Sequence, residues 1–549
     1  MSARPKPVVL VILDGWGLAP PGPGNAVSQA ATPNFNSLWG AYVRTQLIAH
    51  GESVGLPKRE PGNTETGHLN LGAGSIIYQD LPRINMAVAD GSFFQNPALI
   101  AAVSHVKQHN SRLHLMGLVG GGGVHSDLSH FFATLRFAHD QGIGSQVFLH
   151  LFTDGRDSPP SASMTYINQL QSAMTREQTG ATASVIGRYY AMDRDFRWDR
   201  TAKAYFCLTE GTGKSATSVD AAISQSYSLN QTDEFIEPTN IVGPDNHPLA
   251  LIKDNDAVIF INFRIDRPRQ LTKAFVLDDF AVSANVAGFD PYAIKYQHKH
   301  EVDVSSKQKP FDRPRKPQNL FFVTMTEYEK NLPVHIAFPP QIVENPLGRI
   351  IADQGLRQLR MSESEKERFV TYYFNGLRED AFNGEDRQIV PSPKVPTYDK
   401  KPAMSVRELT DKALAAIRTA SYDLIVMNYA NADMVGHTGN LKATIAACEA
   451  IDACLGDLAN TVIGAGGVIV LTADHGNAEE MINLSTGLVD TEHNANPVPF
   501  IVAGNDYRTA SQVPQGILAD VAPTLLSLMG IPIPISMTGR NILSGLHAP

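Results

Sequence analysis

The chain has 549 residues, of which 43% are apolar and 18% are charged, a balance typical of a globular enzyme with about two or three domains. A formal net charge of −9 argues against nucleic acid and acidic membranes as partners, and no apolar run approaches the roughly 20 residues that cross a bilayer. The three cysteines, Cys207, Cys448 and Cys454, form no CxxC motif. An odd number in so long a chain favours a reducing compartment, so a cytoplasmic location is expected.

Candidate metal ligands follow three aliphatic runs. Residues 8–13 precede Asp14, residues 424–428 precede Asp433 and His437, and residues 468–471 precede Asp474 and His475. Such runs predict strands that are buried on both faces of a parallel sheet, and ligands bind beyond the carboxyl ends of these strands. Carboxylate and imidazole together suit Zn, Mn or Fe(II). One such run could precede an ordinary exposed turn, but the threefold recurrence favours a metal site.

A glycine-flanked loop, residues 61–70, presents Thr64 at the expected start of a helix. Backbone N–H groups at a helix start can bind an anion. Thr64 could act as a nucleophile if a base or a metal removed its proton. A threonine that only caps the helix would produce the same pattern, so this loop alone leaves both interpretations open.

Arginines follow the expected strands from about residue 81 to residue 329. Arg156 follows the strand at 147–152, Arg188 and Arg194 follow the strand at 183–186, and Arg264 and Arg267 follow the strand at 257–263. A guanidinium binds carboxylate or phosphate through two parallel hydrogen bonds. Any one of these arginines could form a surface ion pair, but five beyond three strands indicate convergence on one anionic ligand.

The metal-type residues lie near both ends of the chain and the arginines lie in its middle. We therefore expect an α/β fold in which one domain, residues 83–337, is inserted into another, residues 1–82 and 338–549, with the active site in the cleft between them. The charged segment 280–317, which contains His298 and His300, is interpreted as a solvated insertion loop. Beyond it the sequence predicts helices at 348–359, 405–420 and 441–458, and a strand at 369–374.

The motifs together resemble cofactor-independent phosphoglycerate mutase, a family of the alkaline phosphatase superfamily. On the metal side the resemblance is carried by Asp14, Gly62-Asn63-Thr64-Glu65, Gly67-His68, Asp433, Gly436-His437, Thr472-Ala473-Asp474-His475-Gly476 and His493. On the arginine side it is carried by Gly123-Val124-His125-Ser126, Asp154-Gly155-Arg156-Asp157, Gly187-Arg188-Tyr189-Tyr190, Asp193-Arg194, Asn262-Phe263-Arg264 and Asp266-Arg267. The resemblance covers nearly the whole chain apart from residues 280–317.

The resemblance implies an alkaline-phosphatase-like domain with a mainly parallel sheet flanked by helices and two divalent ions, with Mn²⁺ as the expected metal. By analogy, one ion is held by Asp433, His437 and His493, and the other by Asp14, Thr64, Asp474 and His475. The implied substrate-binding residues are His125, Arg156, Asp157, Arg188, Arg194, Arg264, Arg267 and Lys366. Thr64 would be the nucleophile, Asp157 the general acid/base, and Lys366 a contact to the phosphate. The implied reaction interconverts 3- and 2-phosphoglycerate through a phosphoenzyme, without 2,3-bisphosphoglycerate, in glycolysis and gluconeogenesis.

Two positions depart from the family pattern. Thr64 stands where serine is usual, and Gly120-Gly121 stand where Ser-Asp is usual. Threonine keeps the hydroxyl, although its methyl group restricts χ1, so activity is expected to survive. The alternatives are a metal-dependent phosphomonoesterase of the same superfamily, in which water completes the reaction, and a silent homologue that only binds phosphoglycerate. The expected partner is phosphoglycerate, with no nucleic acid and no membrane, and the expected state is a monomer.

Overall fold

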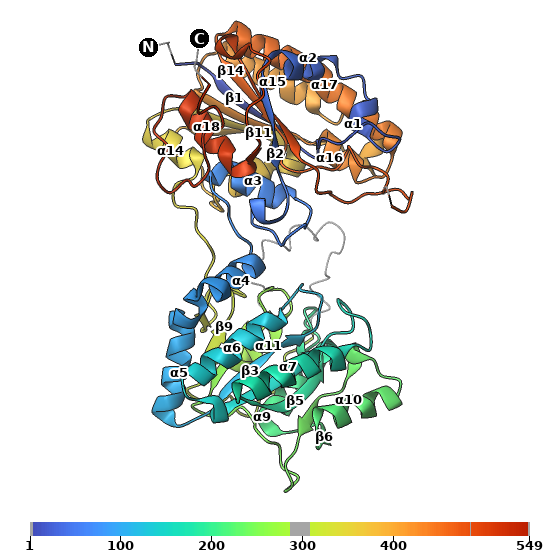
Figure 1. Ribbon diagram of the computed structural model, residues 1–549, viewed down its shortest axis with the longest axis vertical. Helices are drawn as coiled ribbons and strands as arrows, with labels where there is room; N and C mark the ends of the chain where they lie inside the picture. Colours follow the sequence, from blue (N-terminus) through green and yellow to red (C-terminus); the bar gives the residue numbers. More distant parts are fainter. Residues whose placement is uncertain (1–3, 286–307, 484, 547–549) are drawn as a thin grey trace. The chain divides into compact units, whose positions relative to one another are not determined.

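The computed structural model describes residues 4–285, 308–483 and 485–546, and the chain divides into two units (Figure 1). Unit 1 comprises Met1–Gln79 and Gln341–Pro549, and unit 2 comprises Asp80–Pro340. Each unit contains one eight-stranded sheet within the described residues. His298 and His300 lie outside the described residues. Over that same range, no helix combines the length and apolar character needed to span a membrane.

The sheet of unit 1 has the strand order β12-β11-β13-β1-β14-β15-β2-β16. Its strands are β1 (Val8–Leu13), β2 (Val43–Ile48), β11 (Gln358–Glu363), β12 (Glu385–Val390), β13 (Leu424–Tyr429), β14 (Val468–Thr472), β15 (Val498–Ala503) and β16 (Gly516–Ile517). The three predicted strands β13, β1 and β14 are confirmed and are adjacent and parallel, whereas β15 runs antiparallel to β14 and β2. The carboxyl ends of β13, β1 and β14 therefore meet at one edge of the sheet.

Helices cover both faces of this sheet (Figure 1). They are α1 (Ala26–Gln29), α2 (Pro33–Ala41), α3 (Thr64–Ala73), α14 (Leu347–Asp353), α15 (Val406–Arg418), α16 (Asn431–Gly436), α17 (Leu441–Gly464) and α18 (Val521–Leu528). Helices α15 and α17 pack together on one side, while α3 packs with α14 and α18 on the other. The predicted helices at 405–420 and 441–458 are thus confirmed as α15 and α17.

Two predicted elements of unit 1 differ from the structure. The helix expected at 348–359 exists as α14 but ends at Asp353, because Gly355 adopts a left-handed conformation (φ +67°), and the chain then enters strand β11. The strand expected at 369–374 is instead a π-helical turn, Phe369–Tyr373. Its aromatic and β-branched residues are typical of a strand, but the fully buried side chains Val370 and Phe374 are four residues apart, which is a helical spacing.

The sheet of unit 2 has the order β10-β9-β8-β3-β4-β5-β7-β6. Its strands are β3 (Leu113–Val119), β4 (Val147–Thr153), β5 (Ala181–Gly187), β6 (Lys214–Ala216), β7 (Thr239–Ile241), β8 (Ala257–Phe260), β9 (Phe321–Thr324) and β10 (His335–Ile336). The central strands β8, β3, β4 and β5 are parallel, and β7 is antiparallel to β5. The predicted strands that precede the arginines therefore exist as β4, β5 and β8; β4 and β5 are adjacent, whereas β3 lies between β4 and β8.

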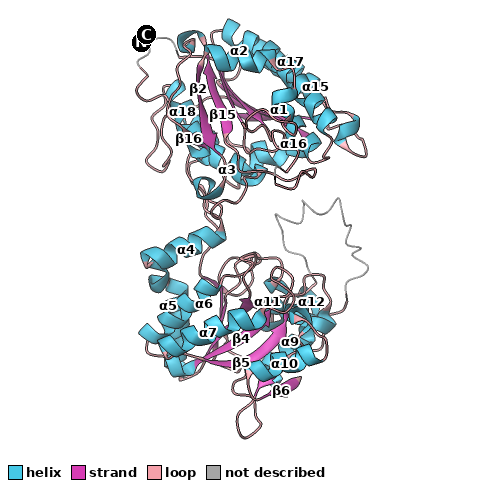
Figure 2. Ribbon diagram, turned by 45° about the vertical axis from the view of Figure 1, so that its right-hand side comes forward, coloured by secondary structure: helices cyan, strands magenta, loops and turns pink. Residues whose placement is uncertain are grey.

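Helices also pack on both faces of the second sheet (Figure 2). They are α4 (Asp80–Asp90), α5 (Pro97–His109), α6 (Leu128–Asp140), α7 (Ser163–Glu177), α8 (Arg188–Ala191), α9 (Trp198–Glu210), α10 (Val219–Ser228), α11 (Pro268–Val276) and α12 (Phe280–Ser283). Side chains of α5, α6 and α7 form one apolar core with the sheet, and side chains of α9 and α11 form another. The expected α/β class is confirmed for both units.

Candidate metal centre and arginine cluster

Three acidic side chains follow the adjacent strands of unit 1. Asp14 comes directly after β1, Asp474 comes two residues after β14, and Asp433 lies in α16, which follows β13. All three are essentially buried. The backbone N–H of Asp433 donates to the carbonyl of Asp14 (3.1 Å), which ties the ends of β13 and β1 together. The parallel sheet thus gathers residues that are more than 400 positions apart in the sequence.

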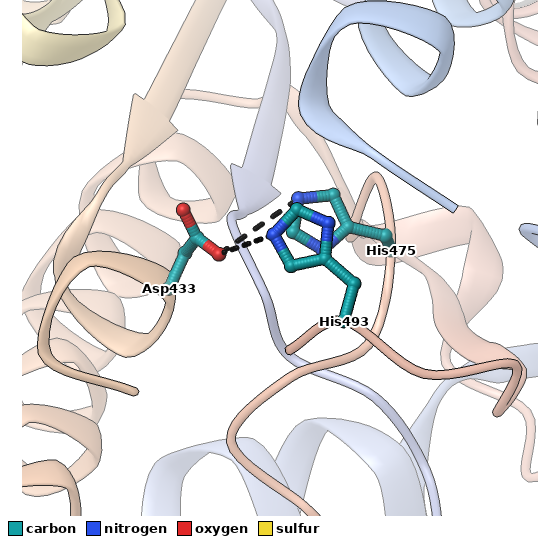
Figure 3. A group of neighbouring side chains, drawn as sticks. All are labelled: Asp433, His475 and His493. Atoms are coloured by element: carbon teal, nitrogen blue, oxygen red, sulfur yellow. Dashed lines mark ion pairs between the residues drawn. The ribbon is translucent and has the colours of Figure 1, made fainter. Parts of the chain in front are cut away.

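Two groups of side chains at this edge can hold a metal ion. Asp433, His475 and His493 each offer one ligand atom, and these atoms lie within 4.8 Å of one another (Figure 3). His437 joins the first group, because its Nε2 lies 3.2 Å from Asp433 Oδ1 and 3.1 Å from His493 Nε2. The second group is Asp14, His68 and Asp474. These mixed oxygen and nitrogen donors fit a divalent transition metal.

Asp14 and Asp433 differ in how far neighbouring positive charges stabilise their ionised forms. Burial and the Asp474 carboxylate raise the pKa of Asp14 to about 7, although the Lys366 ammonium opposes them. Burial also disfavours ionised Asp433, but Lys366 and His437 outweigh it and hold the pKa of Asp433 well below its usual value. The site therefore carries ionised carboxylate that attracts cations.

Thr64 is the first residue of α3, and its hydroxyl does not cap the helix. Asn63 is the N-cap, since its side chain accepts from the Thr66 N–H (2.9 Å). Thr64 Oγ1 instead lies 2.9 Å from His475 Nε2 and accepts a hydrogen bond from Lys366 Nζ (3.1 Å). An imidazole and an ammonium thus flank the hydroxyl, an arrangement that suits a nucleophile.

Lys366 lies in a short 3₁₀ turn, Ser364–Lys366, immediately after β11. Its buried ammonium donates to Asp14 Oδ1 (2.8 Å) and to Asp433 Oδ2 (2.7 Å). Burial alone would lower the pKa of Lys366, but these two carboxylates raise it above its ordinary value. Lys366 is therefore a permanent cation beside the Thr64 hydroxyl.

The arginine cluster of unit 2 is built around Asp154 and Asp157. Arg188 starts α8 directly after β5, is 2% exposed, and donates to Asp154 and to Asp157 Oδ2 (2.6 Å). Burial raises the pKa of Asp157, but the hydrogen bond and charge of Arg188 outweigh burial and hold this pKa below its usual value. Asp157 is therefore ionised near neutral pH.

A third carboxylate, Asp266, contacts arginines on the other side of the cluster. Arg194 donates to Asp266 Oδ2 (2.7 Å), and Arg264 Nε lies 3.3 Å from Asp266 Oδ1. His125 lies between the two carboxylates, with Nε2 3.6 Å from Asp157 Oδ2 and Nδ1 3.7 Å from Asp266 Oδ1. Burial lowers the pKa of His125 to about 4, although Asp266 opposes this shift, so its imidazole is neutral.

The remaining two arginines differ in their surroundings. Arg267 donates to the carbonyl of Met192 (3.1 Å), and burial together with the positive charges of Arg188 and Arg194 lowers its pKa to about 10. The Arg156 side chain is 56% exposed and lies 3.5 Å from Glu234. Unit 2 thus brings together all five predicted arginines and His125 around a site where an added anion would relieve repulsion between guanidinium groups.

The glycines at positions 120 and 121 have a steric explanation. A Cβ atom on Gly121 would lie 2.6 Å from the Tyr166 hydroxyl, and one on Gly120 would lie 2.8 Å from Asp154 Oδ2. Ser158 accepts from the Gly121 N–H (3.0 Å) and donates to Asp154 Oδ2 (2.8 Å). Ser158 and Tyr166 therefore fill the space, and Asp154 keeps a hydroxyl donor.

Two buried polar residues beside the metal centre were not assigned a role from the sequence. His68 lies one helical turn after Thr64 on α3, a spacing that could have identified it as a neighbour of the nucleophile. Asn428 interrupts the otherwise apolar interior of β13, which was the available signal. Both side chains are fully buried and contact the carboxylates that follow β1 and β14.

Comparison with known proteins gives a consistent set of relatives. The family model described as "BPG-independent PGAM N-terminus (iPGM_N)" matches residues 84–330. The chain is 49% identical over 546 residues to the 2,3-bisphosphoglycerate-independent phosphoglycerate mutase of Chloroflexus aggregans, covering 98% of this chain and 99% of that protein. It is 47% identical to the same enzyme of Moorella thermoacetica, with 98% of each chain covered. Among solved structures, Leishmania mexicana phosphoglycerate mutase at low cobalt concentration matches 98% of both chains, with 29% identity and a TM-score of 0.57.

Proposed function

The chain belongs to the 2,3-bisphosphoglycerate-independent phosphoglycerate mutase family, and from this premise we propose how its residues divide the reaction between them. It is an isomerase that interconverts 3-phosphoglycerate and 2-phosphoglycerate, and its family is metal-dependent. The observation that carries the proposal is the Thr64 hydroxyl, which lies 2.9 Å from His475 and 3.1 Å from Lys366 within the group of candidate metal ligands.

We propose that unit 1 holds two Mn²⁺ ions. The proposed ligands are Asp433, His437 and His493 for one ion, and Asp14, Thr64, Asp474 and His475 for the other. Two groups of ligand atoms, each within 4.8 Å, support a pair of ions, although His475 belongs to the first group and not to the second. Its Nε2 lies 3.5 Å from Asp14 Oδ1 and 3.5 Å from Asp474 Oδ2. When bound, the ions would lower the pKa of the Thr64 hydroxyl and neutralise charge on the phosphoryl group.

Thr64 is the proposed nucleophile. Its hydroxyl loses a proton as Oγ1 forms a bond to phosphorus, the bond between phosphorus and a glycerate oxygen breaks, and this oxygen takes up a proton. The other glycerate hydroxyl then loses a proton and attacks phosphorus, the bond between phosphorus and Oγ1 breaks, and Thr64 takes a proton back. Lys366 would contact the phosphoryl group, an assignment that its hydrogen bond to Thr64 supports.

Asp157 is the proposed group that carries the proton between the two glycerate hydroxyls. The nearby Arg188 holds its pKa low, so Asp157 is ionised before substrate binds. Bound phosphoglycerate adds negative charge beside Asp157, and this raises the pKa toward the range of a useful acid/base catalyst. His125, Arg156, Arg188, Arg194, Arg264 and Arg267 are the proposed ligands of the substrate's anionic groups.

The test is an enolase-coupled assay of 3-phosphoglycerate turnover with Mn²⁺ and without 2,3-bisphosphoglycerate, with free phosphate followed in parallel. Thr64→Ala should abolish turnover and phosphoenzyme while the ion proposed at Asp433, His437 and His493 stays bound, and Thr64→Ser is the matched control that retains the hydroxyl. Full activity of Thr64→Ala would refute the nucleophile assignment. Free phosphate as the main product would favour the phosphomonoesterase alternative. Binding without turnover would favour the silent homologue.

We also propose that the chain acts as a monomer in the cytoplasm, where phosphoglycerate is metabolised. The proposed phosphatase-like domain is residues 1–82 and 338–549, and the proposed substrate-binding domain is residues 83–337. The division of the chain near residues 79 and 340 supports these boundaries. Light scattering of the purified chain measures the oligomeric state.

A further inference from the structure

Two buried side chains connect the carboxylates that follow β1 and β14. His68 Nδ1 lies 3.1 Å from Asp474 Oδ2, and His68 Nε2 lies 3.1 Å from Asn428 Nδ2. Asn428 Nδ2 in turn donates to Asp14 Oδ2 (2.6 Å). The sequence Asp474–His68–Asn428–Asp14 is therefore a continuous chain of polar contacts, here called the His–Asn bridge, and it is closed to solvent.

The hydrogen-bond partners define the protonation of the bridge. The Asn428 amide nitrogen has two hydrogens, of which one is given to Asp14 and the other points to His68 Nε2, so this ring nitrogen accepts. The opposite amide orientation would place two oxygens, Oδ1 and the Asp14 carboxylate, against each other. His68 therefore carries its proton on Nδ1, which faces the Thr64 carbonyl (3.0 Å) and Asp474.

Both nitrogens of His68 are thus engaged within the protein. His68 belongs to a group of potential ligands with Asp14 and Asp474, but its donor and acceptor positions are already used, so its imidazole is not available to coordinate. Within the bridge, Asn428 donates to Asp14 Oδ2, and His68 Nδ1 lies 3.1 Å from Asp474 Oδ2. The Oδ1 atom of Asp14 remains directed to Lys366 (2.8 Å), on the side of Thr64.

We propose that His68, supported by Asn428, is a positioning residue that orients Asp14 and Asp474 for a divalent ion and is not itself a ligand. This inference rests on the proposed metal dependence of the same site. Because His68 and Thr64 share α3 and His68 contacts the Thr64 carbonyl, the bridge also sets the position of the nucleophile relative to Asp474. Residues that orient metal ligands in this way commonly change metal affinity by about 10–100-fold when they are removed.

The experiment measures Mn²⁺ binding to the full-length protein by calorimetry and electron paramagnetic resonance, together with the melting temperature. His68→Ala and Asn428→Ala should each lower the affinity of the protein for one of the two Mn²⁺ ions by about 10–100-fold and leave the affinity for the other unchanged. His437→Gln, which removes a proposed ligand of the other ion, assigns the two binding events. His68→Asn should recover much of the affinity, because its amide N–H can replace the Nδ1–H donor.

Asn70→Ala is the matched control. Asn70 is a fully buried residue of α3 whose amide donates to the carbonyls of Val54 and Thr66, neither of which belongs to the bridge. It should lower the melting temperature without changing either Mn²⁺ affinity. Unchanged affinities in His68→Ala, or equal weakening of both ions as in a general loss of structure, would overturn the proposal.

Loss of a whole equivalent of Mn²⁺ in both His68→Ala and His68→Asn would make His68 a ligand and would also overturn the proposal. The proposed function fails separately, if the wild-type protein binds two ions but forms no phosphoenzyme. That result leaves the effect of the bridge on metal affinity measurable, so the two failures are distinguishable.

Discussion

Arg188→Gln tests whether one buried arginine holds the carboxylates of the arginine cluster in place. The substitution removes the guanidinium that donates to Asp154 and Asp157 and leaves two carboxylates without their main counter-charge. Breaking a buried ion pair from one side costs roughly 3–5 kcal/mol. The lower end of this range of free energies applies here, because Asp154 keeps Ser158 Oγ as a donor (2.8 Å) and the Asp157 side chain is 24% exposed to water.

A loss of about 3 kcal/mol should lower the melting temperature of a unit of this size by roughly 6–12 °C. Hydrogen exchange of peptides from β4 and β5, followed by mass spectrometry, assigns the loss to unit 2. Arg176→Gln is the matched control, because the Arg176 side chain is 66% exposed, and its ion pair with Glu177 should contribute at most about 1 kcal/mol. Adding Asp157→Asn to Arg188→Gln should restore part of the stability. Equal stability of the Arg188 and Arg176 variants would refute this reasoning.

Two further predictions concern pH and substrate binding. Burial lowers the pKa of both His114 and His150. Below about pH 6.5 the unfolded chain therefore takes up protons that the folded unit excludes. The unfolding free energy should then fall as the pH drops, by up to roughly 1.4 kcal/mol per pH unit for each histidine. Denaturant titrations between pH 7 and 5 should give a shallower dependence for His150→Gln, and an unchanged slope would contradict the assignment. Arg194→Met should raise the KM for 3-phosphoglycerate by roughly 10-fold or more. The melting temperature should change little, since the Arg194 side chain is 44% exposed. An unaltered KM in steady-state kinetics would exclude Arg194 from the substrate site.

The strands that carry the metal centre could be predicted because their sequences admit few alternatives. Residues 8–13 are six consecutive aliphatic residues, and all six are fully buried in β1 between two parallel neighbours. Once β13, β1 and β14 are recognised as parallel, the ends of the strands must meet, and Asp14 and Asp474 become neighbours without any knowledge of their side-chain conformations.

Residues that reach the site from irregular structure could not be placed by the same reasoning. Lys366 lies on a 3₁₀ turn after β11, a strand that was not predicted and whose first two residues were assigned to the preceding helix, and His493 lies in a loop before β15. No periodic pattern encodes the path of such segments, so the roles of these two residues came from the family resemblance, although the sequence already showed His493 in a loop before an apolar strand. The turn at Phe369–Tyr373 was misassigned for a related reason, since aromatic and β-branched residues can be buried at helical as well as strand spacing.

The electrostatics of unit 1 explain why its polar residues are interdependent. Asp14, Asp433 and Asp474 converge with a single buried ammonium, Lys366, which donates to the first two. The raised pKa of Asp14 indicates that one lysine does not fully compensate three carboxylates in a dry environment. The proposed metal ions would add the charge that this set of donors requires, whereas the His–Asn bridge supplies orientation through its polar contacts. The same edge of the sheet thus combines cationic groups that compensate charge with side chains that hold the carboxylates in place, because the ends of parallel strands bring all of them together.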